Sequence, residues 1–187
     1  MNTHLFIDTE WADAEGRQLV SLALVSEDGE YVFYGERDPL PENATQFVRE
    51  VVYPLLDRGR VAMDDRLFTN RLRKFLLQIE APIVLYEEPN DLALLKQALS
   101  GFALTDSEAA ACGPIPNVAA TRIAESGMLR MMIQDWFDSH SDARAMRHHA
   151  RVDAQALRMG WLAANSKIEP DWSATWREYR KLRSGNT

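Results

Sequence analysis

Two carboxylates stand close together near the start of the chain. Asp8 and Glu10 follow the apolar run Leu5 to Ile7 and are separated by one residue. On a β-strand, alternate side chains point to the same face, so these two acids project together. Neighbouring carboxylates repel each other unless a cation lies between them, and bare carboxylates most often hold Mg²⁺ or Mn²⁺. The pair is a candidate half of a metal site, and a turn that sends one acid toward solvent would explain it equally well.

The rest of such a site must come from distant segments, because two acids cannot fill a six-coordinate shell. Residues 83–86 have the pattern of a buried strand, and Asp91 opens the helical pattern that follows, one turn before Leu95. Asp153 lies on the apolar face of a later helical pattern, where a carboxylate needs a partner. His148 precedes Asp153 by five residues, which is roughly 140° around a regular helix. We therefore expect His148 in the loop before this helix or at its first turn.

Three segments resemble, in this order, the motifs of the DEDDh branch of the DnaQ-like 3′-to-5′ exonucleases: Asp8-Thr9-Glu10, Asp91, and His148-x-Ala150-x-x-Asp153. Their ordered co-occurrence carries more weight than any one motif. The Asp-Thr-Glu-aromatic opening and the short chain are most similar to the small single-domain bacterial exoribonucleases of this superfamily. In the related tyrosine branch a Tyr stands four residues before the last Asp. His149 occupies that position here, and His148 takes the place of the histidine of the DEDDh branch.

The resemblance implies hydrolysis of a phosphodiester with two bound Mg²⁺ or Mn²⁺ ions, which hold the scissile phosphate and activate a water. Asp8 would bridge both ions, and Glu10, Asp91 and Asp153 would complete the shells. His148 would accept the proton of the water as general base. Structural alternatives remain, because acids such as Asp91 favour the first turn of a helix without any metal, and His148 could cap or pack against its helix.

Three residues are candidates for contacts with the substrate. Trp11 could stack on a terminal base if a turn redirects its ring, or it could pack in the core. Ser21 and Leu22 could line the nucleotide pocket if the second strand runs beside the first. The choice between RNA and DNA depends on contacts to a 2′-hydroxyl, which no motif reveals, so RNA is favoured only by the closer resemblance.

The composition fits one soluble catalytic domain covering residues 1–187. The chain has 187 residues, of which 46% are hydrophobic, and this is enough to bury a core. The single cysteine, Cys112, excludes an internal disulfide and a cysteine-based zinc cluster, and it favours a cytoplasmic protein. The sequence shows neither a signal peptide nor an apolar run of membrane-spanning length.

The acidic balance restricts the kind of nucleic acid that could bind. A net charge of -7 argues against a protein that grips long duplexes through their phosphates. This argument does not apply to a metal-dependent nuclease, because bound cations neutralise several of its acids and a short single strand needs few phosphate contacts. Arg71, Arg73 and Lys74 form one of several basic clusters, which we interpret as solvated helix faces.

Patterns along the chain predict an α/β fold. Strands are predicted at residues 5–8, 19–25 and 31–34, the last two joined through the hairpin signal Asp28-Gly29. Further elements are predicted as helices around 45–56, 65–79, 128–137 and 145–164, a strand near 115–118, and a C-terminal helix at about 169–183. The resemblance implies that they form a ribonuclease-H-like mixed β-sheet flanked by α-helices.

We therefore expect an enzyme that trims the 3′ ends of single-stranded RNA and releases nucleoside 5′-monophosphates, without a membrane partner. A homodimer is left open. The alternatives are a 3′-to-5′ exodeoxyribonuclease, a metal-dependent hydrolase of small phosphodiesters, and a catalytically inactive nucleic-acid-binding module. The complete set of four acids and His148 argues against the last of these.

Overall fold

A six-stranded mixed sheet forms the centre of the computed structural model, which describes residues 2–184. Residue 1 and residues 185–187 of the predicted domain lie outside this range. The strands are β1 (Thr3–Trp11), β2 (Leu19–Ser26), β3 (Val32–Arg37), β4 (Ala62–Met63), β5 (Pro82–Tyr86) and β6 (Ala119–Arg122). Their order across the sheet is β4-β3-β2-β1-β5-β6. The predicted α/β class is confirmed, and the sheet is compatible with the predicted ribonuclease-H-like architecture.

The first three strands form an antiparallel meander, and β5 joins β1 in parallel on the other side. The turn between β2 and β3 contains Gly29 at a φ of +81°, a left-handed conformation that glycine adopts without steric cost. The Asp28-Gly29 hairpin predicted from the sequence is therefore confirmed. Strand β5 pairs with β1 only over Thr3 to Phe6, whereas the C-terminal part of β1, from Ile7 to Trp11, pairs with β2.

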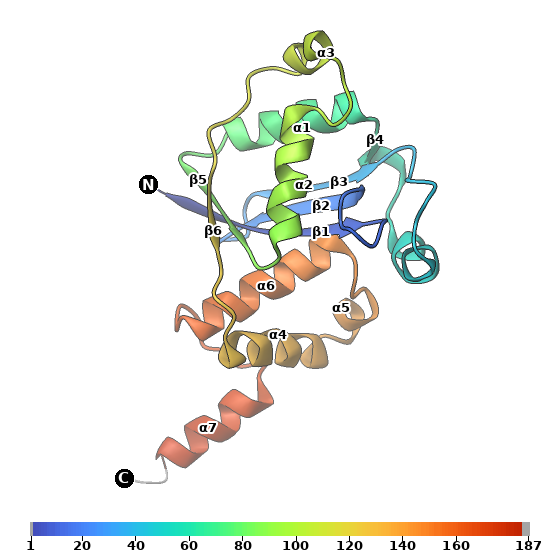
Figure 1. Cartoon of the computed structure of the whole chain (residues 1–187). Helices are drawn as coiled ribbons and strands as arrows, with labels where there is room; N and C mark the ends of the chain where they lie inside the picture. Colours follow the sequence, from blue (N-terminus) through green and yellow to red (C-terminus); the bar gives the residue numbers. More distant parts are fainter. Residues whose placement is uncertain (1, 185–187) are drawn as a thin grey trace.

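The described range contains ten helical segments. They are η1 (Val48–Val52), η2 (Tyr53–Leu55), η3 (Gly59–Val61), α1 (Asp65–Leu77), α2 (Pro89–Ser100), α3 (Asp106–Ala111), α4 (Gly127–Ser139), α5 (Ser141–Ala145), α6 (Ala150–Ala164) and α7 (Ala174–Ser184). Figure 1 shows α1 and α2 on one side of the sheet and α6 on the other, with α4 beyond α6. Within residues 2–184, no helix is long and apolar enough to cross a membrane.

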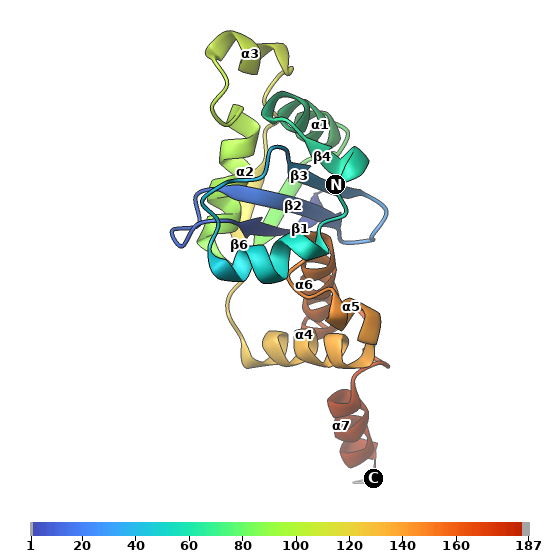
Figure 2. The same ribbon diagram turned by 90° about the vertical axis from the view of Figure 1, so that its right-hand side faces the viewer.

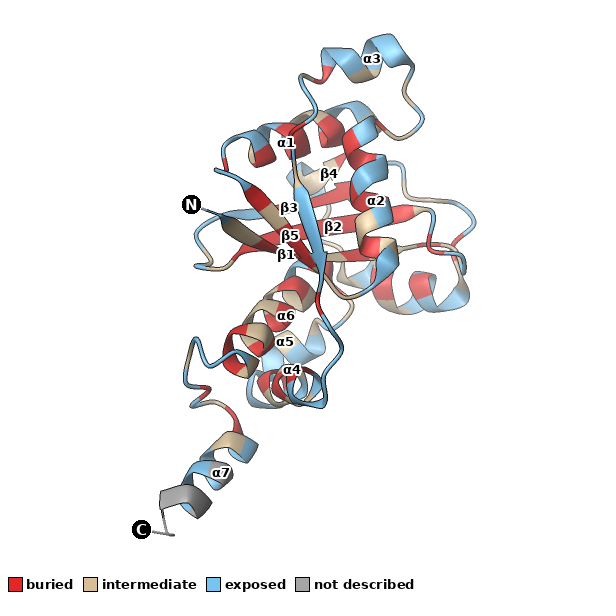
Figure 3. Ribbon diagram, turned by 60° about the vertical axis from the view of Figure 1, so that its left-hand side comes forward, coloured by how far each residue is buried: buried red, intermediate tan, exposed pale blue. Residues whose placement is uncertain are grey.

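Alternate side chains of β1 point toward the two helical layers, one formed by α1 and α2 and the other by α6. Leu5 and Ile7 belong to the main core cluster, to which α1 and α2 also contribute. Phe6 faces the other layer, where its ring lies 5.3 Å from that of Trp161 in α6. Figure 3 shows the resulting concentration of buried residues along the central strands. Asp8 and Glu10, which share the parity of Phe6, are therefore directed to the α6 side.

Several predicted boundaries differ from the structure. The strand predicted at 115–118 lies at Ala119–Arg122, and the helix predicted from 145 begins at Ala150 after a turn. The segment predicted as one helix at 45–56 is a π-helix followed by a 3₁₀-helix, with Pro54 in the latter. The C-terminal helix begins at Ala174 and not near 169, because Ser173 accepts a hydrogen bond from the N–H of Trp176 and so caps the helix.

Arg73 does not lie on a solvated helix face, contrary to the interpretation of its basic cluster. Its side chain is buried, and its guanidinium donates hydrogen bonds to three backbone carbonyls, those of Leu99, Ala109 and Gly113. These carbonyls lie at the end of α2, in α3 and just after α3. Arg73 therefore connects α1 to the end of α2 and to the segment, including α3, that links α2 to β6.

We expect Arg73→Met to lower the free energy of unfolding by roughly 2–4 kcal/mol, because it leaves buried carbonyls without donors. Chemical denaturation of the purified variant measures this loss. Arg71→Met is the matched control on the exposed side of α1 and should change stability by less than about 0.5 kcal/mol. Equal stability of the two variants would show that the buried guanidinium is dispensable.

Candidate metal and catalytic site

A cavity of about 390 Å³ opens at the C-terminal end of β1. Its walls come from β1, the segment around residues 45–48, the start of α2 and the start of α6. All five residues predicted to be catalytic line it: Asp8, Glu10, Asp91, His148 and Asp153. The structure thus brings together side chains that are up to 145 positions apart in the sequence, from Asp8 to Asp153.

Strand β1 supplies two of the acids from one face. Asp8 pairs with Ala23 and Glu10 with Ser21 on β2, and the intervening Thr9 points to the opposite side. The first turn of α6 lies over this face, where Ala150 and Ala154 pack against Ala23. Small residues on both elements allow the helix to approach the strand closely, which places Asp153 beside the two strand carboxylates.

Asp91 reaches the cavity from α2. Pro89 stands at the start of this helix, a position that suits proline because no intrahelical donor is lost there. Asp91 is buried in the first turn and accepts two hydrogen bonds on one oxygen, from the N–H (3.1 Å) and the hydroxyl (2.7 Å) of Thr9. Thr9 therefore fixes this carboxylate next to the two acids of β1.

His148 and Asp153 come from the beginning of α6. His148 lies in the turn before the helix, as its spacing from Asp153 predicted, with a φ of +73°. Its N–H donates to Oδ2 of Asp153 at 3.1 Å. Its ring meets that of Phe47 edge to face at 5.1 Å between centroids. The backbone of the histidine and the carboxylate of Asp153 are therefore held as one unit.

The four carboxyl groups are poor acids in this arrangement. Burial, together with the charges of Asp153 and Asp91, raises the pKa of Glu10 to about 9. Burial, the charges of the other three acids and the charge of Glu87 raise the pKa of Asp8 well above its usual value. Burial also raises the pKa of Asp91 to about 7, although hydrogen bonds from Thr9 oppose this shift.

The pKa of Asp153 is raised to about 6 by burial, against the hydrogen bond from the N–H of His148 and the charge of Arg147. Among residues 2–184, no salt bridge joins any of the four acids to a lysine, arginine or histidine. Four neighbouring carboxylates that form no salt bridge with these residues favour either protonation or a bound cation.

The donor atoms fit a hard divalent cation. Oδ1 of Asp153 is buried and has no hydrogen-bond partner among the described residues. One donor atom each from Glu10, His148 and Asp153 lies within 4.8 Å of the other two. An oxygen-rich donor set of this kind is the preferred environment of Mg²⁺ and Mn²⁺.

The candidate substrate contacts have different outcomes. Trp11 lines the cavity and also packs against the main core cluster, and a shift of strand register between Glu10 and Trp11 accompanies this placement. Ser21 and Leu22 are fully buried in β2 and do not line the cavity. The second strand does run beside the first, with Ser21 paired to Glu10 and Leu22 to Thr9, but all side chains of β2 are buried.

Sequence reasoning missed Phe47. This residue lines the cavity and is 50% exposed. Figure 2 shows the segment that carries it, residues 45–56, beside β1 and the start of α6. An aromatic residue inside a helical pattern gave no local signal, because only the packing of this segment places the ring beside His148.

Comparisons with known proteins assign no family to this site. No protein-family model matches the chain, and no curated protein sequence matches it.

Proposed function

We propose that this protein is a metal-dependent 3′-to-5′ exoribonuclease of the DEDDh type, working in the cytoplasm with two Mg²⁺ or Mn²⁺ ions. The observation that carries the proposal is the convergence of four carboxylates and His148 in one cavity, where no salt bridge among the described residues involves any of the four acids. The order of the three motifs supports the same assignment. The cytoplasmic location is supported by the single cysteine, which is buried and unpaired.

In this proposal Asp8, Glu10, Asp91 and Asp153 hold the cations. When bound, divalent cations supply a water of lowered pKa and stabilise the charge that develops on the phosphate and the leaving 3′ oxygen. The side chains contribute fixed positions: Thr9 holds Asp91, and the N–H of His148 holds Asp153. Carboxylates that are placed before the substrate arrives lose little freedom during the reaction.

His148 is suited to accept a proton. Burial and the charge of Arg147 lower the pKa of its imidazole. The ring is therefore neutral at neutral pH, which is the form that a general base needs. Its place on the wall of the same cavity as the four acids lets it face a water held there.

The shape of the cavity supports action at a chain end. Its volume of about 390 Å³ lies within the range of roughly 300–1,000 Å³ that is typical of sites for one small ligand. Trp11 and Phe47 provide aromatic surfaces on its walls, against which the terminal base can stack. RNA is proposed as the polymer because the Asp-Thr-Glu-Trp opening is most similar to the small exoribonucleases.

We expect the protein to shorten linear single-stranded RNA from the 3′ end and to release nucleoside 5′-monophosphates, with Mg²⁺ or Mn²⁺ and not with chelator. Labelled oligonucleotides resolved on a gel, with mononucleotides identified by chromatography, measure this activity. A 3′-phosphate should block the reaction, and stable duplex should stall it. The control is a circular strand of the same sequence, which offers no end.

Each other result identifies a different function. Equal digestion of circular and linear strands means endonucleolytic cleavage and contradicts the proposal. A clear preference for DNA, or cleavage of a simple phosphodiester without cleavage of oligonucleotides, replaces the substrate that we propose. Metal-dependent binding of a single strand without any product identifies a catalytically inactive binding module.

A further inference from the structure

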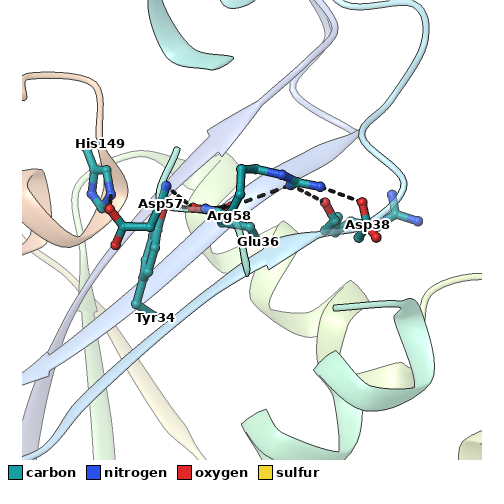
Figure 4. A network of polar contacts seen from close by, with 7 residues as sticks. Tyr34, Glu36, Asp38, Asp57, Arg58 and His149 are labelled. Atoms are coloured by element: carbon teal, nitrogen blue, oxygen red, sulfur yellow. Dashed lines mark hydrogen bonds and ion pairs between the residues drawn. The ribbon is translucent and has the colours of Figure 1, made fainter. Parts of the chain in front are cut away.

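A polar network lies beside the catalytic cavity and connects two of its walls. One wall belongs to the segment that carries Phe47 and continues to Arg58, and the other is the start of α6 with His148 and Asp153. Figure 4 shows the network, with His149 at one end, Asp57 and Arg58 in the middle, and Asp38 at the other end. None of these four residues lines the cavity.

His149 is the member that belongs to α6. Its side chain is fully buried and stacks on the ring of Tyr34 at 4.6 Å between centroids. Neither ring nitrogen has a hydrogen-bond partner among the described residues, and Nε2 lies 3.6 Å from Oδ1 of Asp57. A buried imidazole without hydrogen bonds is unfavourable, so the nearby carboxylate is the group that can compensate it.

Asp57 is held in place from the sheet. Its N–H donates to Oε1 of the fully buried Glu36 at 2.7 Å, and the N–H of Arg58 donates to Oε2 at 3.0 Å. The hydroxyl of Tyr34 donates to the same Oε1 at 2.7 Å. Strand β3 therefore fixes the backbone at Asp57, and through it the position of the carboxylate that faces His149.

His149 also starts the helix that carries the site. Its carbonyl accepts hydrogen bonds from the N–H groups of Val152 (2.8 Å) and Asp153 (3.0 Å). The preceding residue, His148, has the left-handed φ of +73°, which a residue other than glycine keeps only where its surroundings enforce it. A residue anchored directly after His148 is well placed to enforce this conformation.

We propose that Asp57 and His149 form a clasp that positions His148 and Asp153 for catalysis. The clasp joins the segment of Phe47 to the start of α6, and Arg151 adds a second contact between them, with Nη2 3.4 Å from Oδ2 of Asp57. His149 and Asp57 are positioning residues that do not touch the substrate. The inference rests on the proposed exonuclease function for its catalytic consequence, whereas its structural consequence is independent of that function.

The test compares Asp57→Asn with Asp38→Asn. Both replace a carboxylate of the network by an amide of equal size, but Asp38 pairs with Arg58 at the end far from His149. Because a small displacement of catalytic groups strongly affects the reaction step, we expect Asp57→Asn to lower kcat about 10-fold, with KM and Mn²⁺ binding changed less than about 2-fold. Asp57→Glu, which keeps the charge, should recover most of the lost kcat. Asp38→Asn should leave kcat within about 2-fold of the wild type.

A second measurement does not depend on activity. Amide hydrogen exchange at residues 148–153 should become at least about 5-fold faster in Asp57→Asn, while exchange in β5 stays unchanged. If the wild type hydrolyses no nucleic acid, the proposed function fails, and the exchange result still decides whether the clasp exists. Unchanged local exchange overturns the inference, as does a loss of kcat that only follows a general loss of thermal stability.

Discussion

Under the proposed function, we expect Asp8→Asn to abolish hydrolysis, with a loss of at least ~10³-fold in kcat, because a neutral amide cannot replace a carboxylate as ligand of a divalent cation. Asp8 lies at the centre of the acid cluster, and the charges of Asp91, Glu10 and Asp153 all act on it. The same substitution removes charge repulsion, so the metal-free variant should be more stable than the wild type. Steady-state assays and thermal denaturation in chelator measure the two effects.

The gain in stability should depend on pH. The pKa of Glu10 is raised to about 9 and that of Asp91 to about 7 by burial and neighbouring charges, whereas unfolded acids titrate near ~4. Between about pH 4 and pH 9 the folded protein thus binds more protons than the unfolded chain, so the free energy of unfolding of the metal-free protein falls as pH rises. Asp8→Asn should weaken this decline, and Mg²⁺ should restore stability to the wild type at pH 8.

Glu88→Gln is the matched control for this prediction. Glu88 lines the same cavity, but it is exposed to solvent at the start of α2. We expect its kcat to stay within about 3-fold of the wild type, because an exposed carboxylate at the rim is well solvated without a cation. Retention of full activity by Asp8→Asn, or the absence of any stabilisation by Mg²⁺, would remove the metal-site assignment.

The parts of the site that could be predicted are those fixed by local periodicity. The alternation of β1 placed Asp8 and Glu10 on one face, and the helical repeat placed His148 before α6 and Asp91 in a first turn. These relations depend on backbone geometry that a few neighbouring residues determine. They remain true whichever elements pack against the strand.

The parts that could not be predicted depend on tertiary packing. The bond between Thr9 and Asp91 joins residues 82 positions apart, and Phe47 reaches His148 only because its irregular helix lies against β1 and α6. Ser21 does not line the cavity, and its burial could not be predicted because alternation does not reveal that a central strand is covered on both faces. The sequence around Arg73 does not distinguish it from an exposed arginine. The carbonyls that accept its hydrogen bonds lie 26–40 positions further along the chain.

The displaced strand β6 has a related explanation. The apolar residues at 115–118 follow Pro114 and include Pro116, which lacks the N–H that a strand needs for pairing. The true strand, Ala119–Arg122, is exposed along its whole length and pairs only with β5 in the described sheet. An exposed edge strand has no apolar pattern, so hydrophobic periodicity cannot locate it.

His148→Ala should lower kcat by roughly 10²-fold or more and leave metal binding close to that of the wild type, because a general base acts in the transition state and is not a ligand. The methyl group also leaves space beside Phe47, whose ring contacts the imidazole. Added imidazole should therefore restore part of the activity. Single-turnover kinetics measure the rate of the reaction step, and titration with Mn²⁺ measures metal binding.

His140→Ala is the control, because His140 stacks on Trp136 at the end of α4 and does not line the cavity. We expect its kcat to stay within about 2-fold of the wild type, since substitutions away from the site leave the reacting groups in place. Donor atoms of His148, Glu10 and Asp153 lie within 4.8 Å of one another, so the imidazole is also close enough to serve as a ligand. If His148→Ala loses Mn²⁺ affinity together with activity, and imidazole restores neither, the histidine holds the cation and the proton must be accepted by another group.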